Sequence, residues 1–155
     1  MAIVSFNFIR MNAERQSTIR GRLNINNNIT IKDVRNADLA FGKAQESALR
    51  FTFEFLSSYE PKAGEILIVG ELIDMLPEAE VKDIIDAWQR NKRVPQGAMA
   101  RILPTILNRC NIQALILSRD INLPPPIPMP RVNVQETQQG LPAGTHTVVK
   151  KPKKK

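Results

Sequence analysis

The residues with the most direct chemical potential are lysines gathered near the C-terminal end of the sequence. The last six residues are Lys150-Lys151-Pro152-Lys153-Lys154-Lys155. Residues 131–155 hold six basic residues against one acidic residue, so most of the net charge of +7 lies there. Such a solvated run of like charge can meet phosphates on nucleic acid or on a membrane surface. The alternative is a tail that only promotes solubility.

Side chains suited to catalysis or metal binding are scarce. His146 is the only histidine and Cys110 the only cysteine, so neither a zinc site nor a nucleophile–histidine pair is predicted. Cys110 falls on the apolar stripe of a predicted helix, which favours a small core residue. Asp83 and Asp86 are spaced as i, i+3 on a predicted helix, which favours a solvated face over an acid–base pair. We expect no enzyme activity, no metal and no cofactor.

Three phenylalanines at alternate positions could form a platform on which RNA bases stack: Phe51, Phe53 and Phe55. The regularity of the spacing favours the simpler interpretation, in which the rings fill the space between a sheet and its helices. The glycine-rich aromatic signature of an RNA-recognition motif is missing from the sequence.

Alternation of apolar and polar residues predicts strands that bury one face. In the first strand, we place Val4, Phe6 and Phe8 on the same side. The second strand is long, and its asparagines suggest a bend at residues 26–28. A turn over residues 59–64 separates the last two strands. The predicted strands are residues 3–11, 19–31, 49–55 and 66–73.

After the fourth predicted strand, the spacing of apolar residues changes from the period of a strand to that of a helix. Pro77 and Glu78 are typical of a first helix start, and Pro95 of a second. Pro104 lies inside the second run, so it predicts either a kink or a break into two helices. Residues 112–117 are apolar on nearly all sides, which suits a helix buried on several sides. The expected buried stripe of the second helix is Met99, Ile102, Leu103, Ile106, Leu107 and Cys110.

These elements predict an α+β fold, a four-stranded antiparallel sheet with two C-terminal helices packed on one face. An extended proline-rich segment, residues 123–130, follows the helices. We assign residues 1–133 to one domain and residues 134–155 to an extended basic tail. Leu56, Leu67 and Val69 fall out of phase with the main core face. They predict an apolar partner surface or, as the preferred interpretation, an oligomer interface.

Composition sets the broad class of protein. The 155 residues suffice for one core, and a single cysteine excludes an internal disulfide. The sequence opens without a basic leader ahead of an apolar stretch, and no segment approaches the ~18 apolar residues of a membrane span. We therefore expect a soluble, cytoplasmic protein. Acidic residues concentrate in residues 51–90, between two basic regions, which argues against the whole domain lying flat on RNA.

The order of elements resembles that of SecB, the export chaperone. The resemblance is strongest over Arg109–Pro130, where the apolar helix end Cys110–Leu117 leads through Arg119-Asp120 into Ile121-Asn122-Leu123-Pro124-Pro125. Phe6-Asn7-Phe8-Ile9-Arg10 is similar to the family's first strand. The stretch Leu49-Arg50-Phe51-Thr52-Phe53-Glu54 is similar to basic, archaeal SecB-like proteins. The resemblance implies a SecB-like fold. In that family, an acidic homotetramer holds unfolded chains in apolar grooves for export.

Two functional hypotheses follow from these features. In the first, a SecB-like binding protein joins the ribosome or another RNA assembly, with rRNA or ribosomal proteins as partners. The basic side chains of its C-terminal tail would contact RNA phosphates, and an acidic lipid surface could compete with RNA for the same tail. In the second, the chain is a SecB-like chaperone that binds unfolded polypeptides and can form a homo-oligomer. The residues predicted to bind RNA are Arg131, Lys150, Lys151, Lys153, Lys154 and Lys155.

Overall fold

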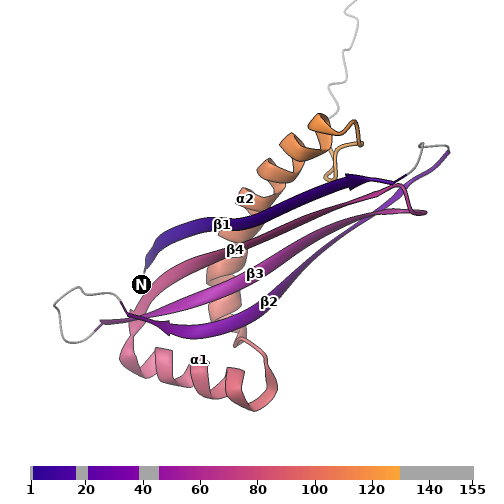
Figure 1. The fold of residues 1–155 in the computed structure, drawn as a ribbon. Coiled ribbons are helices and arrows are strands. Elements are labelled where there is room, and N and C mark those ends of the chain that lie inside the picture. Colours follow the sequence, from indigo (N-terminus) through magenta and orange to yellow (C-terminus); the bar gives the residue numbers. More distant parts are fainter. Residues whose placement is uncertain (1, 17–20, 39–45, 130–155) are drawn as a thin grey trace, which may run out of the picture.

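A computed structural model describes residues 2–16, 21–38 and 46–129 of the chain. Its strands form one antiparallel sheet of spatial order β1-β4-β3-β2 (Figure 1). Both helices contribute to one core cluster with the buried face of the sheet, and α2 crosses behind the sheet as drawn. The predicted fold class is confirmed. The elements are β1 (Ala2–Arg15), β2 (Asn24–Ala37), β3 (Glu46–Glu60), β4 (Gly64–Pro77), α1 (Glu78–Asn91) and α2 (Gln96–Asp120).

The central strand β3 shows why the sheet has one dry face. Phe51, Phe53 and Phe55 are fully buried, whereas Thr52 and Glu54 point to the other face. The phenylalanines therefore fill the core, as the preferred interpretation had it, and do not form a stacking platform. Residues that face each other across antiparallel strands share a face, so β4 supplies the matching apolar residues Ile66, Ile68 and Leu72.

Gly70 is the point where β4 passes closest to its neighbours. It lies opposite Phe53 on β3 and opposite Phe8 on β1. A Cβ atom at this position would come within 2.5 Å of the Phe53 ring and 2.7 Å of the Asn7 carbonyl oxygen. The absence of a side chain thus lets the Phe53 ring lie across β4, where it packs 5.3 Å from the Phe6 ring.

The first strand departs from simple alternation at two places. Its register against β4 shifts between Ile3 and Ser5 and again between Phe8 and Arg10. Each shift inserts one extra residue and changes which side chains face the core. Ile3 packs against the core, while Val4 is 48% exposed. The prediction that Val4 shares a side with Phe6 and Phe8 was wrong for this reason.

The second strand keeps a regular register against β3 at its asparagines, where a bend was predicted. Its irregularity lies between Ile31 and Asp33, not at residues 26–28. Asn27 keeps the regular register, and its Oδ1 accepts a hydrogen bond of 2.7 Å from the Ser57 hydroxyl on β3. The strand was predicted over residues 19–31, and residues 19 and 20 lie outside the described residues. In the structure β2 begins at Asn24 and runs on to Ala37.

The remaining strands run beyond their predicted ends. The third strand was predicted over residues 49–55 and the fourth over 66–73, but both extend further at each end. The turn between them is confined to residues 61–63, so Tyr59 belongs to β3 and is buried. Backbone pairing across the hairpin continues as far as Tyr59 opposite Gly64, which explains the extra length.

The helices begin at the predicted prolines. Pro77 precedes α1 and Pro95 precedes α2, where a missing N–H group costs no helical hydrogen bond. Pro104 lies inside α2, which runs unbroken as one helix, so the alternative of two helices is excluded. The buried row repeats every four residues and consists of Ala98, Ile102, Ile106, Cys110, Ala114 and Ser118.

Two predictions about burial on α2 were wrong. Leu107, placed in the buried stripe, is 37% exposed because the buried row passes through Ile106 and Cys110 instead. Ile112 and Ile116, expected inside a helix buried on several sides, are 53% and 39% exposed. The sheet covers one face of α2, and nothing else in the described part of the chain covers the face that carries these isoleucines.

Candidate functional site

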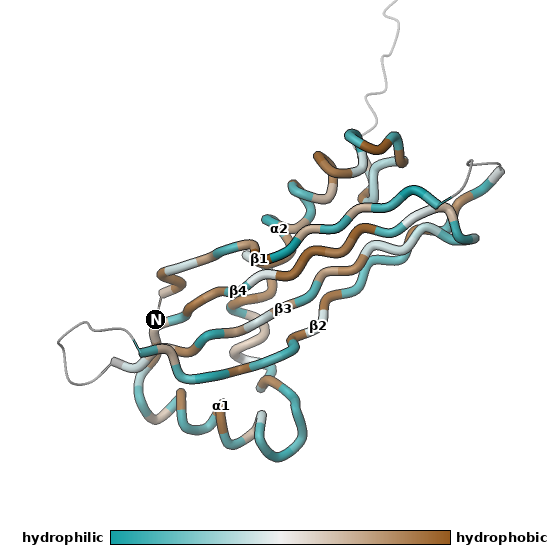
Figure 2. Tube along the Cα trace, viewed as in Figure 1, coloured by the Kyte–Doolittle hydropathy of each residue, from teal (hydrophilic) through white to brown (hydrophobic). Residues whose placement is uncertain are grey.

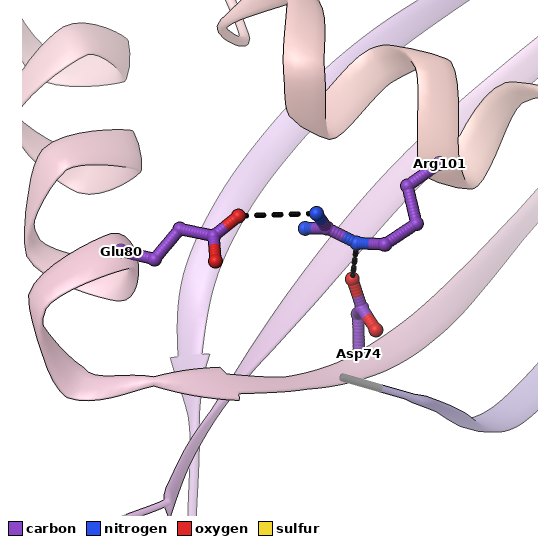
Figure 3. Close-up of polar contacts among 3 residues, drawn as sticks. All are labelled: Asp74, Glu80 and Arg101. Atoms are coloured by element: carbon purple, nitrogen blue, oxygen red, sulfur yellow. Dashed lines mark hydrogen bonds and ion pairs between the residues drawn. The ribbon is translucent and has the colours of Figure 1, made fainter.

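An ion cluster around one buried carboxylate connects the two helices to the sheet (Figure 3). Arg101 on α2 donates from Nε to Asp74 Oδ2 on β4 at 2.8 Å and from Nη1 to Glu80 Oε1 on α1 at 3.0 Å. Asp74 is fully buried. Burial alone would lower the pKa of Arg101, but its hydrogen bonds and charge interactions with both carboxylates raise it. The cluster is a structural clamp, because one cation on α2 bridges a carboxylate of β4 and a carboxylate of α1.

Cys110 is a core residue, as the sequence suggested. It is fully buried on α2, and burial raises the pKa of its thiol to about 12. The thiolate, which is the reactive form, is therefore strongly disfavoured in the folded chain. His146 lies outside the described residues, and among those that are described no cluster of acidic, cysteine or histidine side chains could hold a metal ion. Asp83 and Asp86 are both solvent-exposed.

A thiol-reactive dye tests the burial of Cys110. We expect labelling under native conditions to be slower by at least ~100-fold than in denaturant, because the thiol reacts only after local or global opening. The matched control is the double variant Cys110→Ala/Gln96→Cys, which moves the thiol to an exposed position in the first turn of the same helix. Equal native labelling rates for the wild type and this variant would contradict a buried thiol.

The predicted apolar surface lies on the face of the sheet opposite the aromatic core. Leu56 on β3 and Leu67 on β4 face each other directly across the two strands, and Val69 lies two residues further along β4. All three side chains are partly buried. The structure thus brings the three residues together, while their role in binding stays a prediction.

Charged side chains surround these three residues on the same face. Glu54 is opposite Val69 and forms an ion pair of 3.6 Å with Lys32 on β2. Arg50 and Glu71 make a similar contact across β3 and β4 at 3.7 Å. Ion pairs on the same face therefore border the small apolar area on the side of Val69.

Further exposed apolar residues lie on α2 and β1. Those on α2 had been assigned to the core by the sequence interpretation. Figure 2 shows hydrophobic colour on the C-terminal part of α2, at the end of the sheet where β1 is the edge strand. Ile112 and Ile116 are one helical turn apart, which puts them on a common face that we call the α2 outer face. The all-round apolar character of residues 112–117 was the signal for this surface. The exposed apolar residues of β1 are Val4, Ile9 and Met11.

The basic residues predicted to bind RNA are Arg131, Lys150, Lys151, Lys153, Lys154 and Lys155, and all lie outside the described residues. Within the described part, the two central strands carry acidic side chains. Glu54 forms an ion pair with the basic side chain of Lys32, and Glu71 with that of Arg50. No helix in the described part of the chain is long and apolar enough to cross a membrane.

Comparisons with known proteins give a likeness of fold. No protein-family model matches the chain, and no curated protein matches it. Among solved structures, the fold aligns with the Mycobacterium tuberculosis Rv1957 SecB-like chaperone, in complex with a ChAD peptide from the Rv1956 HigA1 antitoxin. The TM-score is 0.47 at 13% sequence identity, and the alignment covers 85% of this chain and 89% of that chain.

Proposed function

We propose that this chain is a non-enzymatic, SecB-like chaperone that holds unfolded polypeptides on exposed apolar side chains. The observation that carries the proposal is the exposure of large apolar residues on β1 and α2 of the folded chain. Exposed apolar surface of this kind commonly marks a site for polypeptide partners. Such contacts are non-directional, so they suit clients that share apolar character and no common sequence.

The exposed residues of β1 fit an adaptable client surface. Ile9 is 59% exposed and Met11 is 46% exposed, on a strand at the edge of the sheet. Methionine adjusts its shape readily, which favours binding of varied apolar partners. The two register shifts of β1 against β4 are bulges, and bulges also disturb the regular row of hydrogen-bonding groups on the outer edge of an edge strand. We therefore assign client contact to the side chains of β1 and not to strand addition along its backbone.

We propose that the α2 outer face associates with a second copy of the chain. Ile112 and Ile116 have the i, i+4 spacing of helices that pack side by side. Leu107 adds a third exposed apolar residue on the same helix. The SecB-like resemblance also implies a homo-oligomer. This division leaves the β1 residues for clients and the α2 outer face for assembly.

A light-scattering assay of an aggregating, unfolded client tests the holding activity. We expect the wild-type chain to suppress aggregation at a modest molar excess and the variant Ile9→Ser/Met11→Ser to lose most of that suppression. The control variant Asn7→Ser/Asn12→Ser changes exposed polar residues of the same strand and should behave as the wild type. Failure of the wild-type chain to suppress aggregation would refute the chaperone proposal.

Association with RNA is a second candidate function, favoured by the five lysines within residues 150–155. Each lysine that neutralises a phosphate releases counterions, so binding of this kind weakens steeply as salt rises. Sedimentation of lysate through a density gradient at low and high salt measures it. If the tail is an RNA anchor, deletion of residues 146–155 abolishes salt-sensitive co-sedimentation with ribosomes and leaves holding intact. Absence of the intact chain from ribosomal fractions at low salt would exclude this function.

A further inference from the structure

The segment that follows α2 turns back onto the end of the sheet (Figure 1). Asn122 adopts a left-handed conformation with φ of 56°, which ends the helix, and the Leu123 N–H donates to the Ser118 carbonyl at 2.8 Å. The chain then runs without helix or strand through Met129. We call residues 123–129 the proline strap.

Side chains of the sheet hold the strap by its main-chain carbonyls. The Tyr59 hydroxyl donates to the Pro124 carbonyl at 2.6 Å, and Asn27 Nδ2 donates to the Pro126 carbonyl at 2.7 Å. Two carbonyls spaced i, i+2 are thus bound by two adjacent strands, β3 and β2. Neither hydrogen bond depends on the identity of a side chain in the strap.

This polar site presents hydrogen-bond donors to the strap. The Asn27 Oδ1 accepts from the Ser57 hydroxyl at 2.7 Å, which orients the amide so that Nδ2 donates to the strap carbonyl. Burial raises the pKa of Tyr59 to about 12, against the opposing effect of a hydrogen bond with Ser57, so the hydroxyl keeps its proton at neutral pH. Proline has a backbone carbonyl but no backbone N–H. A proline residue bound at this site therefore has no N–H group that would be buried without a hydrogen-bond partner.

An apolar anchor precedes the two carbonyls. Leu123 is 5% exposed, and its methyl groups lie where a Cβ of Gly64 would approach them at 3.0 and 3.2 Å. The lack of a side chain at Gly64 therefore makes room for Leu123. Pro126 is also buried, while Pro125, Pro128 and Met129 are exposed. In chain order, the site thus binds the apolar side chain of Leu123, the carbonyl of Pro124, and both the buried ring and the carbonyl of Pro126.

We infer that the proline strap is an intramolecular ligand in a site for extended, proline-bearing polypeptide, and that client segments of this chemistry bind by displacing it. The inference deepens the proposed function and rests on it, because it names the class of client segment. A covalently linked strap has a high effective concentration, so it excludes weak ligands and yields to clients that also engage other surfaces of the chain.

Fluorescence anisotropy with the labelled peptide Leu-Pro-Pro-Pro-Ile-Pro, acetylated and amidated, tests the inference on the full chain. The variant Pro124→Gly/Pro125→Gly/Pro126→Gly loosens the strap and keeps every donor of the sheet. We expect this variant to bind the peptide at least ~10-fold more tightly than the wild type, since three prolines no longer restrict the free strap. Should the triple variant fold poorly, the exposed substitution Pro125→Gly alone should give a gain of ~2–5-fold.

Donor variants in the loosened background locate the binding site. Tyr59→Phe removes one hydroxyl, and Asn27→Asp replaces the donor with an acceptor while still accepting from Ser57. Each should weaken peptide binding by ~5-fold or more. Ser58→Ala, which removes a hydroxyl on the opposite face of the same strand, should have no effect.

The outcomes separate this inference from the proposed function. Absence of peptide binding to the loosened variants, equal affinity for wild type and loosened variants, or indifference to Tyr59→Phe and Asn27→Asp would overturn the inference. Any of these results would leave the suppression of client aggregation unaffected. Conversely, loss of that suppression with peptide binding retained would overturn the chaperone proposal and leave the strap site standing.

Discussion

Replacing Arg101 with methionine should lower the free energy of unfolding by about 3–5 kcal/mol, because the change leaves the Asp74 carboxylate buried without its cation. Asp74 is fully buried, and its Oδ1 has no hydrogen-bond partner among the described residues, so its main compensation is the 2.8 Å contact with Arg101. Denaturant unfolding followed by circular dichroism measures the effect. A loss below ~1 kcal/mol would show that the pair is of the weak, solvent-screened kind.

Two further variants isolate the cause of the Arg101 effect. The double variant Asp74→Leu/Arg101→Met removes both charges and should recover most of the lost stability. Arg119→Met removes a surface arginine that lies 3.4 Å from Asp120, with both side chains mostly exposed. That control should change stability by less than ~0.5 kcal/mol. A double variant no more stable than Arg101→Met would mean that packing of the arginine stem matters more than charge.

Charges placed on the α2 outer face should abolish association between copies of the chain. We expect Ile112→Asp/Ile116→Asp to weaken self-association by at least ~100-fold, since it removes two apolar contacts and introduces like charges into the interface. Both isoleucines are substantially exposed within one chain, so the thermal unfolding midpoint of the dissociated form should change little. Sedimentation velocity across a concentration series measures the assembly.

The control for this prediction uses another exposed position of the same helix. Gln96→Glu adds a charge in the first turn of α2, far along the helix from Ile112, and should leave association intact. A wild-type chain that remains monomeric at all concentrations would refute assembly through this face. So would a double-aspartate variant that associates as strongly as the wild type.

The sequence was sufficient to predict the layers of the fold. The alternation of phenylalanines in β3 and the prolines before each helix are local signals, and the structure confirms the strands and helices they imply. Register could not be predicted in the same way. The extra residue at Ile3–Ser5 depends on pairing between β1 and β4, which are far apart in the sequence, so Val4 was misplaced.

The functional surfaces were predicted less completely. The phase of the alternation identified Leu56, Leu67 and Val69. The ion pairs that border them depend on strand order, which the local sequence does not reveal. Leu107, Ile112 and Ile116 were assigned to the core because apolar residues are usually buried. Only the tertiary structure shows that one sheet covers one side of α2. The proline strap was recognised as extended, while its carbonyl contacts join residues about 65 and 99 positions apart.

Binding of a permanently unfolded client at two salt concentrations tests the central claim most directly. The client is a reduced, alkylated and fluorescently labelled protein titrated with the full chain in ~0.1 M and ~0.5 M salt. Apolar contacts are insensitive to screening, whereas lysine–phosphate or lysine–carboxylate contacts weaken with salt. The chaperone account predicts saturable binding that changes by less than ~3-fold between the two salts and survives deletion of residues 146–155. No binding, or binding that collapses in high salt and disappears with the tail, would contradict it.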